Sequence, residues 1–299
     1  MEIVREINNN SDEYWRGVSW VRERFLGKGG YGSVFLVKRK PSVDDHEEEV
    51  NGGLPSVMAM KIARMAKASN LKYEQEILCS FNACPYVIRC YGGKDTEAGN
   101  GSEEKGYSLF LEFCTGGNLY ERISKFVNGL PEHEVRSYTR DIVRGLEYIH
   151  GNGIVHCDIK PANILLVPEE TGGGFIAKLA DFGMAKNVDY TEEKETSDSR
   201  GTFSYMSPEL VKERLLTYPA DVWALGCVVV EMMSGKSAWG CEFSSADDLL
   251  HHIAFSSEVP EIPDSVSEEG KDFLSKCFIR NFYFRWTAEQ LLEHPFLAV

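Results

Sequence analysis

The sequence predicts an α+β protein in which a small β-rich lobe precedes a larger helical lobe. Apolar and polar residues alternate through residues 20–63, around Phe25-Leu26, Val34–Val37 and Val57–Met60, as expected for strands. After Thr115-Gly116-Gly117, which resembles a hinge, helical spacing dominates. A chain of 299 residues is long enough to build both lobes.

Further elements follow from local spacing. Leu109–Phe113 is predicted as a strand, with the polar tract Lys94–Gly106 before it as a loop. The acidic block Pro41–Ser56 is predicted as a second solvated loop. A helix is expected to open at Pro131 and to end near Gly151. Its inner face would consist of Val135, Tyr138, Ile142, Leu146 and Ile149.

Charge and cysteine content exclude some classes of protein. A formal net charge of −14 argues against a nucleic-acid partner or an anionic-membrane surface, although a local basic groove is compatible with it. The longest apolar run, Val222–Val230, is too short to span a bilayer, so membrane insertion is not expected. Eight irregularly spaced cysteines without a Cys-x-x-Cys pair predict reduced thiols. A cytoplasmic protein is therefore expected, with the nucleus as the alternative.

A glycine-rich segment lies near the N-terminus. Gly27–Val34 matches the pattern G-x-G-x-x-G-x-V. Because Val34–Val37 continues as a strand, and not as a helix, these glycines are predicted to form a hairpin tip that bends over phosphate groups. A plain β-turn is the alternative interpretation.

A lysine and a glutamate are predicted to pair beside this hairpin. In the helix expected over residues 70–82, Glu74 shares the apolar face of Leu71 and Leu78. An inward carboxylate is costly without a cation, and Lys61 at the end of its strand is the natural one. Glu76 is the rival partner, but it points away from the apolar face.

Four polar residues in two loops point to phosphoryl transfer. Asp158, Lys160 and Asn163 lie in one short loop, and Asp181 of Asp181-Phe182-Gly183 follows 18 residues later. Asp158 would act as the catalytic base and Lys160 would contact the transferred phosphoryl group. Asn163 and Asp181 would bind Mg²⁺. Two unrelated solvated loops would not explain this order and spacing.

Taken in order, these motifs resemble the eukaryotic serine/threonine protein kinases, from about Trp20 to Phe296. Lys160 together with Thr202 is the serine/threonine signature. Three further segments look like the plant mitogen-activated protein kinase kinase kinases: Glu74–Leu78, His156–Lys160 and Ala220–Cys227.

The resemblance implies a two-lobed protein-kinase domain over residues 20–297, after a short N-terminal extension at 1–19. The N-lobe would cover about 20–113 and the C-lobe about 116–297, with ATP and Mg²⁺ bound between them. The implied activity is phosphorylation of serine or threonine on protein substrates, with a downstream mitogen-activated protein kinase kinase as partner. The alternative is a pseudokinase-like scaffold that uses the fold without efficient transfer.

The resemblance also implies a set of nucleotide-binding residues. Adenine would lie between Val34 and Ala59 on one side and Leu165 on the other, with Leu111 as gatekeeper. Backbone hydrogen bonds are expected near Glu112 and Cys114. The full set is Leu26, Gly27, Lys28, Gly29, Gly30, Tyr31, Gly32, Ser33, Val34, Ala59, Lys61, Glu74, Glu112, Cys114 and Leu165.

Structural roles follow in the same way. Glu209 is expected to pair with Arg285, Asp221 to anchor the catalytic loop, and His156 to brace it. Three residues or pairs depart from the family pattern: Cys157 replaces the usual Arg, Ser207 replaces Ala, and Asn281-Phe282 replaces Asp-Pro.

Control by phosphorylation is the last expectation. Without an Arg at position 157, the cation that receives an activation-loop phosphate is missing, so activity without that phosphate is predicted. Arg200 or Lys186 could replace the cation. The candidate sites are Thr191, Thr196, Ser197, Ser199, Thr202 and Ser204.

Overall fold

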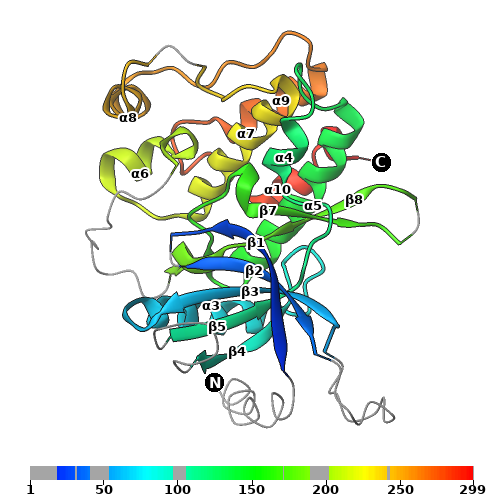
Figure 1. The fold of residues 1–299 in the computed structure, drawn as a ribbon. Coiled ribbons are helices and arrows are strands. Elements are labelled where there is room, and N and C mark those ends of the chain that lie inside the picture. The colour runs from blue at the N-terminus through cyan, green and yellow to red at the C-terminus, as the bar shows by residue number, and fades with distance from the viewer. Residues whose placement is uncertain are drawn as a thin grey trace. The chain divides into compact units, whose positions relative to one another are not determined.

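The computed structural model describes residues 19–30, 32–40, 54–96, 106–170, 172–188, 202–240 and 243–298. The chain divides into two compact units (Figure 1). The N-terminal unit contains Met1–Ala83 and Val87–Phe113, and the C-terminal unit contains Cys84–Tyr86 and Cys114–Val299. Strands dominate the first unit and helices the second, as the sequence predicts.

The N-terminal unit contains an antiparallel sheet of five strands in the order β1-β2-β3-β5-β4. The strands predicted around Phe25-Leu26, Val34–Val37 and Val57–Met60 are present. The turn η1 (Met65–Lys67) leads from the sheet into helix α3. The bounds are β1 (Trp20–Lys28), β2 (Ser33–Arg39), β3 (Val57–Arg64), β4 (Cys90–Thr96), β5 (Gly106–Leu111) and α3 (Ala68–Ser80).

The polar tract Lys94–Gly106 is not a loop at either end, so this prediction was wrong there. Lys94, Asp95 and Thr96 continue β4, because they pair with residues at the start of β5. Residues 97–105 lie outside the described part of the chain. The strand β5 also ends at Leu111 instead of Phe113.

One end of the acidic block is also buried. Leu54 belongs to an apolar cluster that also contains Val37, Met58, Met60 and Phe110. Burial of this side chain removes apolar surface from water, which stabilises the segment that leads into β3. Residues 41–53 lie outside the described residues, so the rest of this predicted loop is not tested.

Helix α3 covers part of the sheet with the face that the sequence predicts. Leu71, Glu74 and Leu78 are all buried. A Cβ at Gly93 of β4 would lie 2.8 Å from the carbonyl oxygen of Ser108 in β5, and 2.5 Å from Oε1 of Gln75 in α3. Because the carbonyl group belongs to the backbone of the neighbouring strand, glycine is favoured there. The helix ends at Ser80, two residues before the predicted boundary.

The C-terminal unit is mostly helical. Helix α5 begins after Pro131 and buries all five of the predicted inner residues. Helix α7 is buried from Ala220 to Met233, which explains the long apolar run. The helices are α4 (Leu119–Ile123), α5 (Glu132–Gly151), α6 (Pro208–Glu213), α7 (Tyr218–Ser234), α8 (Ala246–Phe255), α9 (Glu268–Cys277) and α10 (Ala288–Leu292). None of the helices in the described ranges is long and apolar enough to cross a membrane.

Two small two-stranded sheets and four short turns complete the described part of this unit. The paired strands are β6 (Ile154–Val155) with β9 (Lys186–Asn187), and β7 (Ile164–Pro168) with β8 (Phe175–Leu179). The turns are η2 (Pro161–Asn163), η3 (Phe182–Met184), η5 (Phe203–Tyr205) and η6 (Pro295–Leu297). The loops that carry the predicted catalytic residues therefore follow short strands.

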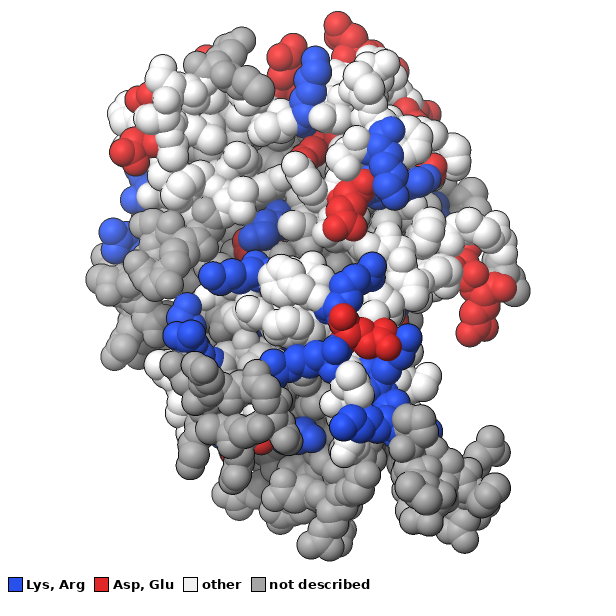
Figure 2. Space-filling model, in the orientation of Figure 1, with Lys and Arg blue, Asp and Glu red and all other residues white. Residues whose placement is uncertain are grey.

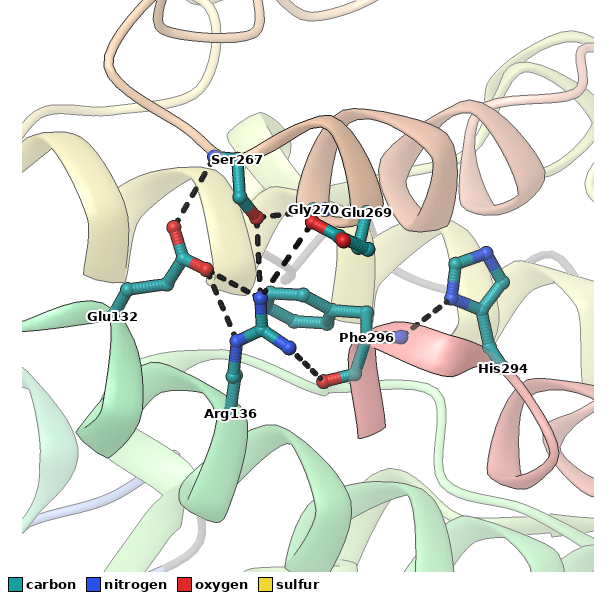
Figure 3. A network of polar contacts seen from close by, with 7 residues as sticks. All are labelled: Glu132, Arg136, Ser267, Glu269, Gly270, His294 and Phe296. Atoms are coloured by element: carbon teal, nitrogen blue, oxygen red, sulfur yellow. Dashed lines mark hydrogen bonds and ion pairs between the residues drawn. The ribbon is translucent and has the colours of Figure 1, made fainter. Parts of the chain in front are cut away.

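A polar network around Arg136 connects the start of α5, the start of α9 and the C-terminal turn (Figure 3). Its guanidinium donates to Glu132 at 2.7 Å and to the carbonyl oxygen of Phe296 at 3.1 Å. Oγ of Ser267, which caps α9, accepts a further bond at 3.3 Å. One planar cation thus holds three chain segments together.

Charge is unevenly distributed along the chain. Figure 2 shows Lys and Arg side chains gathered over β1 and β2. The exposed basic residues on or beside these strands are Arg22, Arg24, Lys28, Lys38 and Lys40. A net charge of −14 for the whole chain therefore coexists with a local group of basic residues along β1 and β2. Net charge alone does not exclude anionic partners for this region.

Candidate active site

Lys61 and Glu74 form a buried ion pair within the N-terminal unit. Nζ of Lys61 lies 2.9 Å from Oε1 and 2.7 Å from Oε2 of Glu74. Both side chains are almost fully buried, at 4% and 1% exposure. Strand β3 supplies the cation, and the inner face of α3 supplies the carboxylate. The rival partner Glu76 is exposed, as its position on the helix predicts.

The glycine-rich segment is the tip of the β1–β2 hairpin, as predicted. Lys28 pairs with Ser33, and the N–H of Gly29 donates to the carbonyl oxygen of Gly32 at 2.9 Å. A Cβ at Gly32 would lie 2.1 Å from the carbonyl oxygen of Ile62, so only glycine fits. Tyr31, the remaining predicted residue of the tip, lies outside the described residues.

The sequence reasoning missed one residue at this tip. Nζ of Lys67, in the turn before α3, donates to the carbonyl oxygen of Gly30 at 2.9 Å. This bond ties the glycine hairpin to the segment that leads into the helix of Glu74. No spacing rule connects two positions 37 residues apart, so this contact could not be predicted from the sequence.

The predicted adenine-binding residues lie on several strands and on the following linker. Ala59 is buried in β3 opposite Leu111 of β5. The N–H of Glu112 donates to the carbonyl oxygen of Arg89, so the backbone group of Glu112 that could bind a base is its carbonyl oxygen. Cys114 is buried and begins the longer segment of the C-terminal unit. Leu165 is half-buried in β7, where it forms a bridge with Asn118.

The catalytic loop brings three of the predicted residues into contact. Nζ of Lys160 lies 2.9 and 2.7 Å from the two carboxylate oxygens of Asp158. Nδ2 of Asn163 donates to Oδ2 of Asp158 at 2.7 Å and to its carbonyl oxygen at 2.9 Å. The Asp158 carboxylate is thus held in one orientation by a cation and an amide. A carboxylate fixed in this way is suited to accept a proton from a hydroxyl group.

The same amide group has one oxygen atom that could bind a metal ion. Because Nδ2 of Asn163 faces Asp158, Oδ1 is the atom left to bind a cation. The chain brings Asp181 near it, since the N–H of Ala180 donates to the carbonyl oxygen of Asn163 at 2.9 Å. Two oxygen donors fit Mg²⁺, which keeps several waters or phosphate oxygens among its ligands. In the described ranges, no group of three or more His, Cys, Asp or Glu could hold a metal ion.

Asp221 fixes the backbone of the catalytic loop, as expected. Its carboxylate accepts bonds from the N–H groups of His156 and Cys157, at 2.8 and 3.0 Å. His156 is fully buried, and its Nε2 lies 3.1 Å from the carbonyl oxygen of Ala180. His156 therefore braces the loop against the segment of Asp181 and does not face a substrate.

The loop of Asp158 and the loop of Asp181 each contain a residue with a strained backbone conformation. Among the described residues other than glycine, three have a positive φ, and two of these are Cys157, at 65°, and Asp181, at 61°. This left-handed conformation is costly for residues with a side chain, and the cost is concentrated where other bonds fix the backbone. Burial, followed by the charge of Asp221, raises the pKa of the Cys157 thiol well above its usual range. Cys157 is therefore neutral and cannot replace the cation of an Arg.

The expected structural pair in the C-terminal unit is also present. Arg285 donates to both carboxylate oxygens of Glu209, at 2.6 and 3.0 Å, and both residues are buried. The unusual Asn281 supports this geometry, since its Oδ1 accepts from the N–H of Tyr283 at 3.1 Å in a turn. The unusual Ser207 caps α6 by accepting from the N–H of Leu210. Both departures from the pattern thus have a local structural use.

Comparison with known proteins agrees with this geometry. The model of the protein kinase domain family matches residues 20–297. Mitogen-activated protein kinase kinase kinase 20 of Arabidopsis thaliana is 42% identical over 286 residues, which are 94% of this chain and 79% of that protein. Mitogen-activated protein kinase kinase kinase 17 of the same plant is 38% identical over 283 residues, 94% of this chain and 70% of that protein.

A human protein is similar to this chain over a smaller share of its own length. Mitogen-activated protein kinase kinase kinase 4 of Homo sapiens is 36% identical over 290 residues, 94% of this chain and 16% of that protein. The family match covers nearly the whole chain, and the buried Lys–Glu pair and the ordered Asp–Lys–Asn loop accompany it. This chain belongs to the protein kinase family, as a serine/threonine kinase of the mitogen-activated protein kinase kinase kinase type.

Proposed function

We propose that this chain transfers the γ-phosphoryl group of ATP to serine or threonine residues of a downstream mitogen-activated protein kinase kinase. The names of the plant relatives support this substrate class. The observation that carries the chemistry is the orientation of Asp158 by Lys160 and Asn163. The cytoplasm or nucleus is the proposed location, because the cysteines of the described segments are free thiols.

In the proposed mechanism, the Asp158 carboxylate accepts the proton of the attacking hydroxyl group and keeps that oxygen directed at phosphorus. Lys160 contacts the transferred phosphoryl group and balances its charge. Lys61, held by Glu74, binds the α- and β-phosphates of ATP. Bound through Oδ1 of Asn163 and the carboxylate of Asp181, Mg²⁺ would neutralise phosphate charge.

The test is transfer of labelled phosphate from ATP to a purified protein substrate. Asp158→Asn removes the base but keeps the size of the side chain, so we expect the rate to fall roughly a thousandfold. ATP binding, measured by calorimetry, should change little. A wild-type rate equal to that of Asp158→Asn would instead support the rival hypothesis of a pseudokinase scaffold.

The substrate class needs its own measurement. A panel of mitogen-activated protein kinase kinases, each inactivated by substitution of its own catalytic lysine, would be incubated with this chain and ATP. We expect phosphate on serine or threonine residues of their activation loops. If phosphate were transferred only to a generic basic protein, the chain would still be a kinase. The proposal that its substrate is a mitogen-activated protein kinase kinase would be rejected.

We further propose that the enzyme is substantially active without a phosphate on its activation segment. The neutral Cys157 supports this, because it offers no positive charge to a phosphate. Lys186 is the main counterargument, since its charge acts on the Cys157 thiol and so lies close to it. Arg200 and most of the candidate sites lie outside the described residues: Thr191, Thr196, Ser197 and Ser199.

Phosphatase treatment tests this second proposal. The treated enzyme, shown by mass spectrometry to carry no phosphate, should keep activity close to that of the untreated enzyme. A loss of about a hundredfold or more, equivalent to about 2.7 kcal/mol of barrier, would reject it. Lys186→Met then distinguishes the cause, because it should abolish the response to phosphate if Lys186 is the acceptor.

A further inference from the structure

Two cysteine sulfur atoms lie in contact on the N-terminal unit. Sγ of Cys79, near the end of α3, is 3.5 Å from Sγ of Cys90 at the start of β4. Cys79 is half-buried and Cys90 is buried. Either thiol can donate its proton to the other sulfur. None of the residues assigned to catalysis or nucleotide binding includes either cysteine.

The backbone around the pair is fixed by one asparagine. Oδ1 of Asn82 accepts from the N–H of Cys90 at 2.8 Å, and its Nδ2 donates to the carbonyl oxygen of Cys90 at 2.9 Å. Asn82 lies two residues after Ser80, the last residue of α3, so these two bonds join the end of the helix to the strand beside the sulfurs. The short distance between the two sulfur atoms is therefore supported by hydrogen bonds that fix the backbone of Cys90.

The two thiols are not equivalent. The hydrogen bond with Cys90 lowers the pKa of Cys79, although burial opposes this shift. The same bond, together with burial, raises the pKa of Cys90 well above its usual range. Cys79 is also the more exposed of the two. A peroxide would therefore react first at Cys79, because the thiolate is the nucleophile.

We propose that Cys79 and Cys90 are a redox modification site, at which hydrogen peroxide forms a reversible disulfide between α3 and β4. The Cys79 thiolate attacks one peroxide oxygen, the O–O bond breaks, and the leaving hydroxide becomes water. The resulting sulfenic acid at Cys79 is attacked by the Cys90 sulfur, which forms the S–S bond and releases a second water. Two thiols are oxidised, and one peroxide is reduced to two waters.

The link would hold α3 in the arrangement that contains the ion pair. Cys79 lies five residues after Glu74 on the same helix, and the sulfurs touch while Glu74 binds Lys61. A covalent bond across this contact would keep the end of the helix against β4. The oxidised enzyme is therefore expected to keep its Lys61–Glu74 pair and to melt at a higher temperature than the reduced enzyme.

Peptide mapping tests the site directly. The folded chain is treated with hydrogen peroxide, its remaining thiols are blocked with iodoacetamide in denaturant, and it is digested with trypsin. Because Lys72, Arg89 and Lys94 are cleavage sites, Cys79 and Cys90 fall on separate peptides, residues 73–89 and 90–94. We expect these two peptides to be joined, with a mass lower by two hydrogens, and to separate after treatment with dithiothreitol.

Cys84 requires a control, since it shares the first peptide with Cys79. Cys84→Ser should form the link as well as the wild type, and Cys79→Ser should not form it. Overoxidation of Cys79 to a sulfinic acid without a joined peptide would overturn the proposal. So would a link that persists in Cys79→Ser.

The melting temperature and the kinase rate of the oxidised chain test the structural consequence. Oxidation should raise the melting temperature of the wild type but not that of Cys79→Ser. It should not lower the kinase rate of the wild type. A fall in rate that is reversed by dithiothreitol and absent from Cys79→Ser would reject the claim that the link preserves the ion pair. The peptide link itself does not depend on kinase activity, so failure of the proposed function would be distinguishable from failure of this proposal.

Discussion

The two units each contain a buried glutamate with a cation, and the two pairs are built differently. Arg285 binds Glu209 through two parallel bonds and also donates to the carbonyl oxygens of Ile279 and Pro219, at 2.9 and 2.7 Å. Lys61 meets Glu74 as a single ammonium group on a flexible stem. The planar, fully engaged arginine suits a permanent structural joint. A lysine can redirect its donors towards a ligand, which suits a phosphate-binding site.

A third buried carboxylate lacks such a partner. Asp141 in α5 accepts one bond, from the N–H of Ala177 at 3.1 Å, and forms no ion pair with the described residues. Burial raises its pKa to about 6, although the charges of Arg144 and Arg140 oppose this. Burial of a carboxylate is thus tolerated in this fold with and without a direct cation, but at different cost. Changing each partner in turn measures that cost.

The largest effect is expected at the arginine. Arg285→Met would leave Glu209 buried without a cation, and the free energy of unfolding should fall by about 3–5 kcal/mol. Urea denaturation measures this fall. Adding Glu209→Gln should recover part of it, because the uncompensated charge is then gone. A fall below about 1 kcal/mol would contradict the view that this pair is a structural joint.

The lysine should affect the rate more than the fold. Lys61→Met is expected to lower the phosphoryl-transfer rate by about a hundredfold or more, equivalent to about 2.7 kcal/mol. It should also destabilise the chain, since Glu74 loses its cation. The double variant Lys61→Met with Glu74→Gln should regain stability but not activity. Recovery of activity in the double variant would show that Lys61 serves only to neutralise Glu74.

The contrast between the pairs also shows what the sequence can predict. Glu74 was predictable because helical spacing places it on the apolar face of Leu71 and Leu78, where a carboxylate requires a cation. Pairing it with Lys61, and Glu209 with Arg285, used the resemblance as well. The loop of Asp158 was predictable because its residues are close together in sequence. Local patterns therefore identified the inward position of Glu74 and the loop of Asp158, whereas the nucleotide-binding set came from the resemblance.

Contacts between distant segments with weak patterns were not predictable. Strand β4 contains Gly92 and Gly93 and has a register shift after Cys90, so its residues do not alternate as strand residues should. The strand forms because it pairs with β5, and a short stretch of sequence around β4 contains no information about that pairing. The contact of Lys67 with Gly30 escaped for the same reason. Tertiary structure decided these features, and local propensity did not.

A smaller effect, of opposite sign, is expected at Asp141. Its pKa is raised on folding, so the ionised carboxylate costs stability above pH 6, and that cost disappears as the pH falls from about 6 towards the unfolded value near 4. Asp141→Asn keeps an acceptor for Ala177 and removes the charge. At pH 7 we expect a gain of about 1–2 kcal/mol in the free energy of unfolding.

The pH dependence separates this explanation from a simple packing effect. The difference between Asp141→Asn and the wild type should shrink to near zero at pH 4, because the wild-type carboxyl is then protonated in the folded protein. Thermal or urea unfolding of both proteins at pH 4, 5, 6 and 7 supplies the curve. A gain that is equal at every pH would mean that ionisation of Asp141 does not cause it.

The smallest effect is expected at an exposed pair that joins β1 and β2. Nζ of Lys38 lies 2.9 Å from Oε2 of Glu23, but the two side chains are 51% and 37% exposed. Water screens such a pair and both side chains lose freedom in forming it, so its coupling energy should be about 0.5 kcal/mol or less. A double-mutant cycle with Lys38→Met and Glu23→Gln measures that energy separately from the other interactions of the two side chains. A value approaching that of the Arg285 pair would show that charge on this sheet, and not burial, sets the strength of ion pairs in this protein.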